Sequence, residues 1–174
     1  MKGNRSILNL LLMLMLFVSC KKSDIAYEND VDRSYRTWIN FRNSSRNSYR
    51  YTVKTTSWTG TTSQTVITVK NGRANQRSYV YQIQSPQNYL ELTIREQWDE
   101  NLTSLNSHTN GFPPLTLDEI YQKAKTDWLL KRDNAETFFE AKNNGMLSTA
   151  GYIENNCADD CFNGVSISSI EKLE

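Results

Sequence analysis

Two cysteines near the C-terminus, Cys157 and Cys161, carry the best-defined chemistry in this sequence. Ala-Asp-Asp separates them, and in an exported protein an oxidising compartment favours a disulfide between them. A bridge that closes so short a loop removes little chain entropy, so its expected role is to fix the shape of a turn. Free thiols or a redox pair are the alternative, although redox motifs usually place two residues between the cysteines.

Carboxylate and amide side chains gather around the same turn and could bind a metal. Asp159 and Asp160 are the candidate ligands, and Glu154, Asn155 and Asn156 lie just before the first cysteine. Oxygen ligands of this kind suit a hard cation such as Ca²⁺. However, the spacing matches no known metal loop, and Asn and Asp are also the residues that β-turns favour. We therefore expect no metal here and no cofactor elsewhere in the chain.

Acid–base catalysis would depend on His108, the single histidine of the chain. Ser107 and Thr109 flank it, but the chain has no Gly-x-Ser-x-Gly, Walker, dinucleotide-binding or His-Glu-x-x-His motif. Asp99 and Glu100 could act as the acid and base of a glycosidase, yet adjacent acids on one loop are more typical of solvated charge. The sequence therefore predicts no catalytic residue.

Trp58 is the candidate binding residue. It lies within Thr-Thr-Ser-Trp-Thr-Gly-Thr-Thr, residues 55–62, a polar segment expected at the tip of a hairpin. An exposed Trp at this position could stack on a sugar or pack into a partner protein. The alternative is a Trp that folds back onto the sheet. Aromatic residues make up 11% of the chain, and we expect most of the others to lie in the core.

The N-terminus has the pattern of an export signal. Lys2 and Arg5 precede an unbroken apolar run, residues 10–18, which is too short to span a bilayer and suits the apolar region of a signal peptide. Phe-Val-Ser-Cys at 17–20 resembles the lipobox of bacterial lipoproteins, which implies removal of residues 1–19 and lipid, such as palmitate, on Cys20. Acyl chains contribute about 0.8 kcal/mol per buried CH₂ to such an anchor. The alternative is an ordinary secretory signal with an incidental cysteine.

The residues after Cys20 indicate in which membrane a lipoprotein of this kind would be located. Lys21 stands where some Gram-negative bacteria place Asp to retain a lipoprotein in the inner membrane, so the resemblance implies the outer membrane, on its periplasmic or surface face. Residues 20–31 are polar and aperiodic and are interpreted as a lipidated tether. Loss of Lys2 and Arg5 with the signal changes the formal net charge from +1 to −1, which argues against a nucleic-acid-binding protein.

Residues 32–174 have the size of a single compact domain. A hydrophobic content of 38% with only 7 Gly and 3 Pro excludes a disordered or collagen-like chain. Alternating hydrophobicity predicts strands at 49–54, 65–70, 73–83, 89–98, 137–142, 146–154 and 164–170. In the fourth of these, Leu90, Leu92 and Ile94 should face inward.

Turn and cap signals connect these strands. Asn71-Gly72 suits a tight primed turn. Residues 32–43 predict a short amphipathic helix, and a capping box at Thr116–Glu119 predicts a second helix that ends near Lys131-Arg132. Residues 99–114 form a long loop, a kind of segment that is often functional. The expected fold is α+β: an antiparallel sheet of about five to seven strands, with a short N-terminal helix and one central helix packed on one face.

The order of several short motifs resembles the bacterial domain-of-unknown-function family 6174 over residues 35–172. The motifs are Trp38, Tyr49–Val53, Val69–Gly72, Leu115–Tyr121, Phe139, Asn144-Gly145, Gly151–Ile153, Asp159-Asp160 and Val165–Ile167. Some members have a cysteine after the first strand, which this chain lacks, and Tyr152 stands where the family has proline. The resemblance implies an exported α+β domain and supplies no catalytic residue.

These features favour a non-enzymatic, lipid-anchored protein of the bacterial cell envelope that binds another envelope component through a sheet face or the long loop. The second hypothesis is an inhibitor, or a module that binds a glycan or an exported protein through Trp58 and residues 99–114. A hydrolase built on His108 is a third. The expected partners are the membrane, through the lipid on Cys20, and an envelope protein or glycan.

Overall fold

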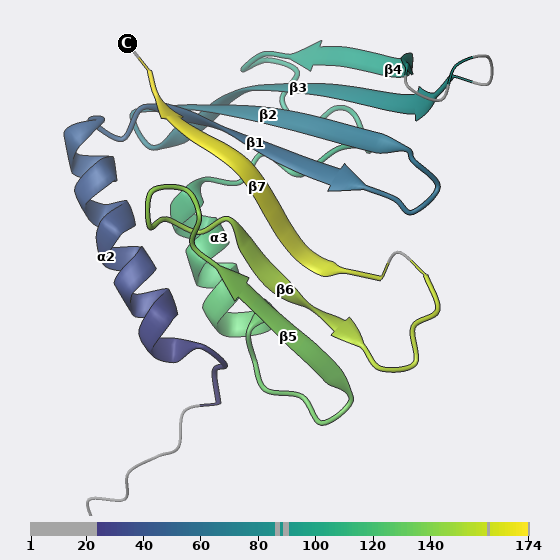
Figure 1. Ribbon diagram of the computed structural model, residues 1–174. Coiled ribbons are helices and arrows are strands. Elements are labelled where there is room, and N and C mark those ends of the chain that lie inside the picture. The colour runs from purple at the N-terminus through teal and green to yellow at the C-terminus, as the bar shows by residue number, and fades with distance from the viewer. Residues whose placement is uncertain (1–23, 86–87, 89–90, 160, 174) are drawn as a thin grey trace, which may run out of the picture.

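The fold is a single antiparallel sheet with helices on one side, which confirms the predicted α+β class (Figure 1). A computed structural model describes residues 24–173 except 86, 87, 89, 90 and 160. The strands are β1 (Tyr49–Thr56), β2 (Thr62–Lys70), β3 (Arg73–Gln84), β4 (Leu92–Glu100), β5 (Ala135–Glu140), β6 (Thr149–Glu154) and β7 (Asn163–Lys172). The helices are α2 (Glu28–Ser44), α3 (Leu117–Lys123) and a π-helical turn, η2 (Ala124–Trp128).

The seven strands follow the spatial order β4-β3-β2-β1-β7-β6-β5. β1 to β4 form a meander of consecutive hairpins, and β5 to β7 form a second meander. The last strand, β7, pairs with the first, β1, and so joins the two meanders into one sheet. This closing pair connects residues more than a hundred positions apart, and no local sequence pattern specifies it.

Helix α2 begins before the predicted start and takes in part of the predicted tether. Val31 is fully buried, Ile25 forms a β-bridge with Leu130, and the Ala26 N–H donates to the Leu129 carbonyl at 2.7 Å. The prediction of a tether as far as residue 31 is therefore wrong for these residues. Two isolated apolar side chains are too few to produce a visible period in the sequence.

The capping box at the start of α3 is confirmed. The Thr116 hydroxyl accepts from the Glu119 N–H at 3.3 Å, and the Glu119 carboxylate accepts from the Thr116 N–H at 2.7 Å. Regular α-helix ends at Lys123, earlier than predicted, and the wider turn of η2 follows it.

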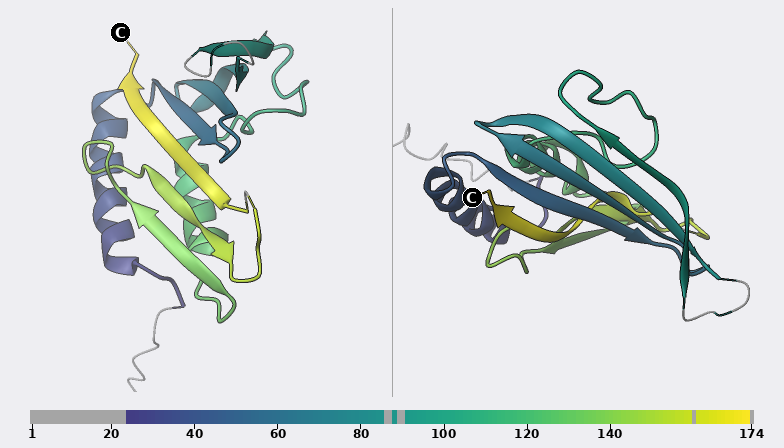
Figure 2. Two further views of the ribbon diagram at one scale, coloured as in Figure 1. Left: turned by 45° about the vertical axis from the view of Figure 1, so that its right-hand side comes forward. Right: turned by 90° about the horizontal axis from the view of Figure 1, so that it is seen from above.

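Both helices lie on the same face of the sheet (Figure 2). The hydrophobic core is formed by side chains of the helices and of the sheet face that they cover. Its fully buried large aromatic and apolar side chains are Trp38, Tyr49, Tyr51, Tyr121, Ile67, Leu117, Ile120, Leu129, Leu147, Val31 and Val69. Polar contacts fix the helices to each other within this core. The Trp38 indole N–H donates to the Asp118 carboxylate at 2.8 Å, and the hydroxyls of Ser34 and Tyr121 are 2.7 Å apart.

The predicted primed turn between β2 and β3 is confirmed, because Asn71 and Gly72 have φ values of 50° and 76°. The inward orientation predicted in β4 is wrong for Leu92 and Ile94, which are 48% and 53% exposed, and Leu90 lies outside the described residues. β4 is an edge strand, and its register against β3 shifts between Tyr81 and Gln82. That shift breaks the simple alternation on which the prediction depended.

Candidate functional site

The sheet opens into a wedge where β1 and β7 separate. The two strands pair from Tyr49–Lys172 to Val53–Ile167, with a register shift between Thr52 and Val53. Beyond that point β1 stays with β2, whereas β7 pairs with β6. The strands diverge toward the side of the molecule that carries the β1–β2 hairpin (Figure 1). We call the resulting hollow the wedge groove.

The wedge groove is an open depression of about 1370 Å³ with an aromatic and hydroxyl-rich lining. Its aromatic side chains are Trp58, Tyr79, Tyr81, Phe112 and Phe162. Its hydroxyl side chains include Thr55, Ser57, Ser63, Ser166 and Ser168. Charged residues are few, with Lys54 on the β1 side and Asp159 on the opposite side. This lining suits an uncharged ligand that offers apolar surface together with hydrogen-bonding groups.

Trp58 lies at the mouth of this groove, on the tip of the β1–β2 hairpin. The Ser57 N–H donates to the Thr61 carbonyl at 2.9 Å, and Gly60 has a φ of 81°, which closes a tight turn that includes Trp58. Trp58 is 75% exposed. Of the two alternatives from the sequence, the structure therefore favours the exposed Trp over one folded back onto the sheet.

The wall of the wedge groove opposite the β1–β2 hairpin is the segment between β6 and β7. Cys157 and Cys161 lie at disulfide-bonding distance, with their Cα atoms 6.2 Å apart. The Phe162 ring lies against the glycines of the neighbouring strands, because a Cβ on Gly151 would collide with the ring and one on Gly164 would be 2.9 Å from the Phe162 Cζ atom. The ring therefore covers these two glycines, while Phe162 stays 37% exposed.

The candidate metal ligands do not converge in the part of the chain that the structure describes. Asp159 is exposed, and Asp160 lies outside the described residues. Among the described residues, no group of three or more His, Cys, Asp or Glu side chains is placed to hold a metal ion.

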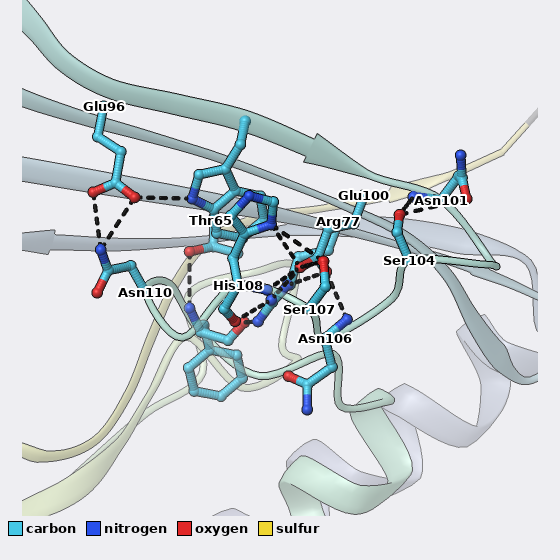
Figure 3. Close-up of polar contacts among 12 residues, drawn as sticks. Thr65, Arg77, Glu96, Glu100, Asn101, Ser104, Asn106, Ser107, His108 and Asn110 are labelled. Carbon is cyan, nitrogen blue, oxygen red and sulfur yellow. Dashed lines mark hydrogen bonds and ion pairs between the residues drawn. The ribbon is translucent and has the colours of Figure 1, made fainter.

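The long loop covers residues 101–115 and not 99–114 as predicted, because β4 extends to Glu100. A buried ion pair holds this loop against the sheet (Figure 3). Arg77 on β3 donates from Nε and Nη2 to both carboxylate oxygens of Glu100 on β4, each at 2.8 Å, and both side chains are at most 1% exposed. Arg77 also donates to the His108 carbonyl at 2.8 Å. Glu100 accepts from the N–H groups of Asn106 and His108, each at 2.7 Å. One carboxylate therefore fixes two separate points of the loop.

His108 belongs to this network. Its Nδ1 is 3.0 Å from a Glu100 oxygen and 3.4 Å from the Ser107 hydroxyl, which itself donates to the same Glu100 oxygen at 3.2 Å. The imidazole stacks on Trp98 with ring centroids 4.3 Å apart. In a serine–histidine–acid relay, the hydroxyl and the carboxylate contact opposite ring nitrogens, whereas here both face Nδ1. The geometry assigns His108 to positioning the loop.

Glu100 was missed as a structural residue. The sequence favours solvated charge for Asp99 and Glu100. This is right for Asp99, which is exposed, and wrong for Glu100, which as a whole residue is 3% exposed. The inward side chains of β4 are Glu100 and Trp98, placed opposite Arg77 and Tyr79 of β3. The local sequence Asp-Glu does not indicate that one of the two acids pairs with an arginine on another strand.

The pinned loop supplies the floor of the wedge groove. The Phe112 N–H donates to the Thr65 hydroxyl at 3.0 Å. Gly111 fits closely over the sheet, since a Cβ there would lie 3.0 Å from Tyr79 Cδ2 and 3.1 Å from the Thr65 hydroxyl oxygen. Phe112 and Pro113 then line the groove beside Tyr79.

We expect acid to unfold this protein partly through Glu100. Hydrogen bonds from Arg77 and from the His108 and Asn106 N–H groups lower the pKa of Glu100 far below its usual range, against the opposing effect of burial. An unfolded glutamate takes up its proton near pH 4.3, so the stabilisation from ionised Glu100 is complete above about that pH and is lost as the pH falls further. Urea unfolding measured between about pH 5 and about pH 3 should show a steeper loss of stability for the wild type than for Glu100→Gln. The Glu171→Gln variant should follow the wild type, and parallel curves for all three proteins would contradict this role.

The predicted lipidation site, Cys20, and the predicted signal peptide lie outside the described residues. Among the described residues, no helix is long and apolar enough to cross a membrane. Comparison with family models, curated proteins and solved structures finds no match to this chain. The resemblance to family 6174 therefore stays a prediction, and the functional argument depends on the geometry of the site.

Proposed function

We propose that this protein is a lipid-anchored binding module of the bacterial cell envelope whose wedge groove holds an exported partner. The observation that carries the proposal is the position of Trp58, 75% exposed at the mouth of a groove lined by other aromatic side chains. Exposed Trp residues beside a recess are typical of binding sites, because covering such a side chain removes a large apolar area from water.

The arrangement of the molecule supports tethered binding. In Figure 1 the first described residues lie at the lower end of the molecule, and the β1–β2 hairpin projects from its right-hand side, well away from them. A lipid on Cys20 would therefore attach the protein to a membrane at a place distant from Trp58. The groove would stay open to a partner while the protein is anchored.

Anchoring predicts a defined modification at the N-terminus. Mass spectrometry of the mature protein should show Cys20 as its first residue with the mass of a diacylglycerol and an added acyl chain. We expect Cys20→Ser to move the protein from the membrane fraction to the soluble fraction, since about 0.8 kcal/mol per buried CH₂ is lost with the chains. An unmodified Cys20, or a mature chain that starts elsewhere, would contradict the anchor.

Binding at the groove predicts contact at Trp58 in living cells. A photo-crosslinking amino acid at position 58 should form a discrete adduct with an envelope component. The same amino acid at Gln122, an exposed position on α3, serves as the control and should not form that adduct. Equal labelling from both positions, or none from position 58, would overturn the groove as the site of binding.

A further inference from the structure

We infer that the ligand of the wedge groove is an extended polypeptide segment that hydrogen-bonds as an added strand to the backbones of β1 and β7 where they separate. This inference rests on the proposed function and names the chemical class of its partner. Its basis is the direction in which the backbone groups of both strands point inside the wedge.

In β1 the even-numbered residues direct their backbone groups toward β7. The Leu173 N–H donates to the Ser48 carbonyl at 3.2 Å, which places Ser48 on the β7 side. The Ser57 N–H donates to the Thr61 carbonyl of the β2 side, which places the odd-numbered residues toward β2. Because backbone groups alternate between the two sides of a strand, the N–H and C=O groups of Lys54 and Thr56 face the wedge.

In the first half of β7 the backbone groups also alternate, and the even-numbered ones face β1. The Ile167 N–H donates to the Ser148 carbonyl at 2.6 Å, which turns the odd-numbered residues toward β6. Gly164 and Ser166 therefore direct their backbone groups into the wedge. Continued pairing would set Ser166 against Lys54, but among the described residues the register between β1 and β7 ends at Val53–Ile167.

The wedge thus presents two strand edges that face each other across a groove. Exposed strand edges are templates for pairing with another chain, and natural proteins usually cover or blunt them. An extended peptide satisfies such edges with its own N–H and C=O groups, whereas a glycan has no comparable row of backbone groups. The backbone geometry therefore favours a polypeptide over an oligosaccharide.

The side chains of the groove indicate what kind of segment fits. Thr55, Ser63 and Tyr81 stand side by side across β1, β2 and β3. The Phe162 ring lies on the opposite wall. Successive residues of an inserted strand would face these two surfaces in turn. We expect a short, uncharged segment with aromatic or apolar side chains at alternate positions.

The test uses the protein purified from its membrane and held in nanodiscs, with a displayed library of random linear nine-residue peptides as the probe. Enriched peptides should slow hydrogen exchange by about tenfold or more at the amides of Lys54, Thr56, Gly164 and Ser166. Trp58→Ala should weaken their binding, and Gln122→Ala should not. N-methylation of alternate peptide residues should weaken binding about tenfold or more, because it removes the edge hydrogen bonds while keeping the side chains.

Each outcome decides the inference. It is overturned if no peptide is enriched, or if the enriched peptides leave those four amides exchanging as before and tolerate N-methylation. Chito-oligosaccharides are the competing probe. Binding of these that depends on Trp58 without protecting the four amides would overturn strand addition and leave the proposed function intact. Failure of both probes, together with no specific adduct from position 58 in cells, would overturn both.

Discussion

Glu100→Gln is expected to lower the free energy of unfolding by about 3–5 kcal/mol, the usual effect of removing one partner from a buried ion pair. The side chains of Arg77 and Glu100 are 1% and 0% exposed, so the variant leaves an uncompensated guanidinium away from water. The same change weakens the hydrogen bonds that the Asn106 and His108 N–H groups donate to the carboxylate. Urea denaturation of wild type and variant at neutral pH measures the loss.

Glu171→Gln provides the matched control. Glu171 pairs with Arg50 at 2.9 Å, close to the distance in the buried pair, but these side chains are 50% and 55% exposed. An exposed pair is worth about 0–1 kcal/mol, so this variant should be close to wild type. Arg77→Met combined with Glu100→Leu should recover part of the loss, since no charge is then left buried. Equal losses for Glu100→Gln and Glu171→Gln would contradict the role of Glu100.

The parts of the fold that were predictable depend on local chemistry. The Asn71-Gly72 turn needs positive φ at both positions, and the capping box needs Thr116 and Glu119 three residues apart. Strand alternation in β1 marks its buried side chains as Tyr49, Tyr51 and Val53, as the structure has them. Each of these signals lies within a few residues, so one sequence is enough to show it.

The parts that were not predictable depend on contacts between distant segments. Glu100 is buried because Arg77 lies opposite it on β3, and Ile25 is ordered because it meets Leu130. Ile94 is exposed because β4 is an edge strand with a register shift, although its alternation resembles that of a half-buried strand. The sequence around each of these residues contains no information about its partner.

The candidate site shows the same division. Trp58 stood out because a Trp among Ser, Thr and Gly is unusual, and its position on a hairpin tip is a local feature. The wedge groove could not be predicted, because it arises from the pairing of the first strand with the last and from the shift between Thr52 and Val53. The pairing skips Ser168, and the core-facing positions of β7 change from Val165 and Ile167 to Ile170 across it. This break in the alternation is local to β7, and nothing in it identifies β1 as the strand that pairs there.

Trp38→Ala is expected to lower the free energy of unfolding by about 3–5 kcal/mol, as for other large aromatic side chains removed from a core. The indole is fully buried, its ring centroid lies 5.0 Å from that of Tyr49, and its N–H donates to Asp118 on α3. Removal of the side chain therefore opens a cavity at the point where α2, α3 and β1 meet. Thermal and urea unfolding of the variant measure the effect.

Two further variants serve as controls. Trp38→Phe distinguishes the loss of packing from the loss of the hydrogen bond, and Trp58→Ala shows the effect of removing a Trp that is not in the core. Trp38→Phe keeps most of the buried area and loses the bond to Asp118, whose carboxylate still accepts from Arg42 at 3.0 Å, so we expect a loss of about 1–2 kcal/mol. Trp58→Ala removes the same kind of side chain from an exposed position and should change stability by less than about 0.5 kcal/mol. If Trp38→Ala were as stable as Trp58→Ala, the burial of Trp38 between α2, α3 and β1 would be contradicted.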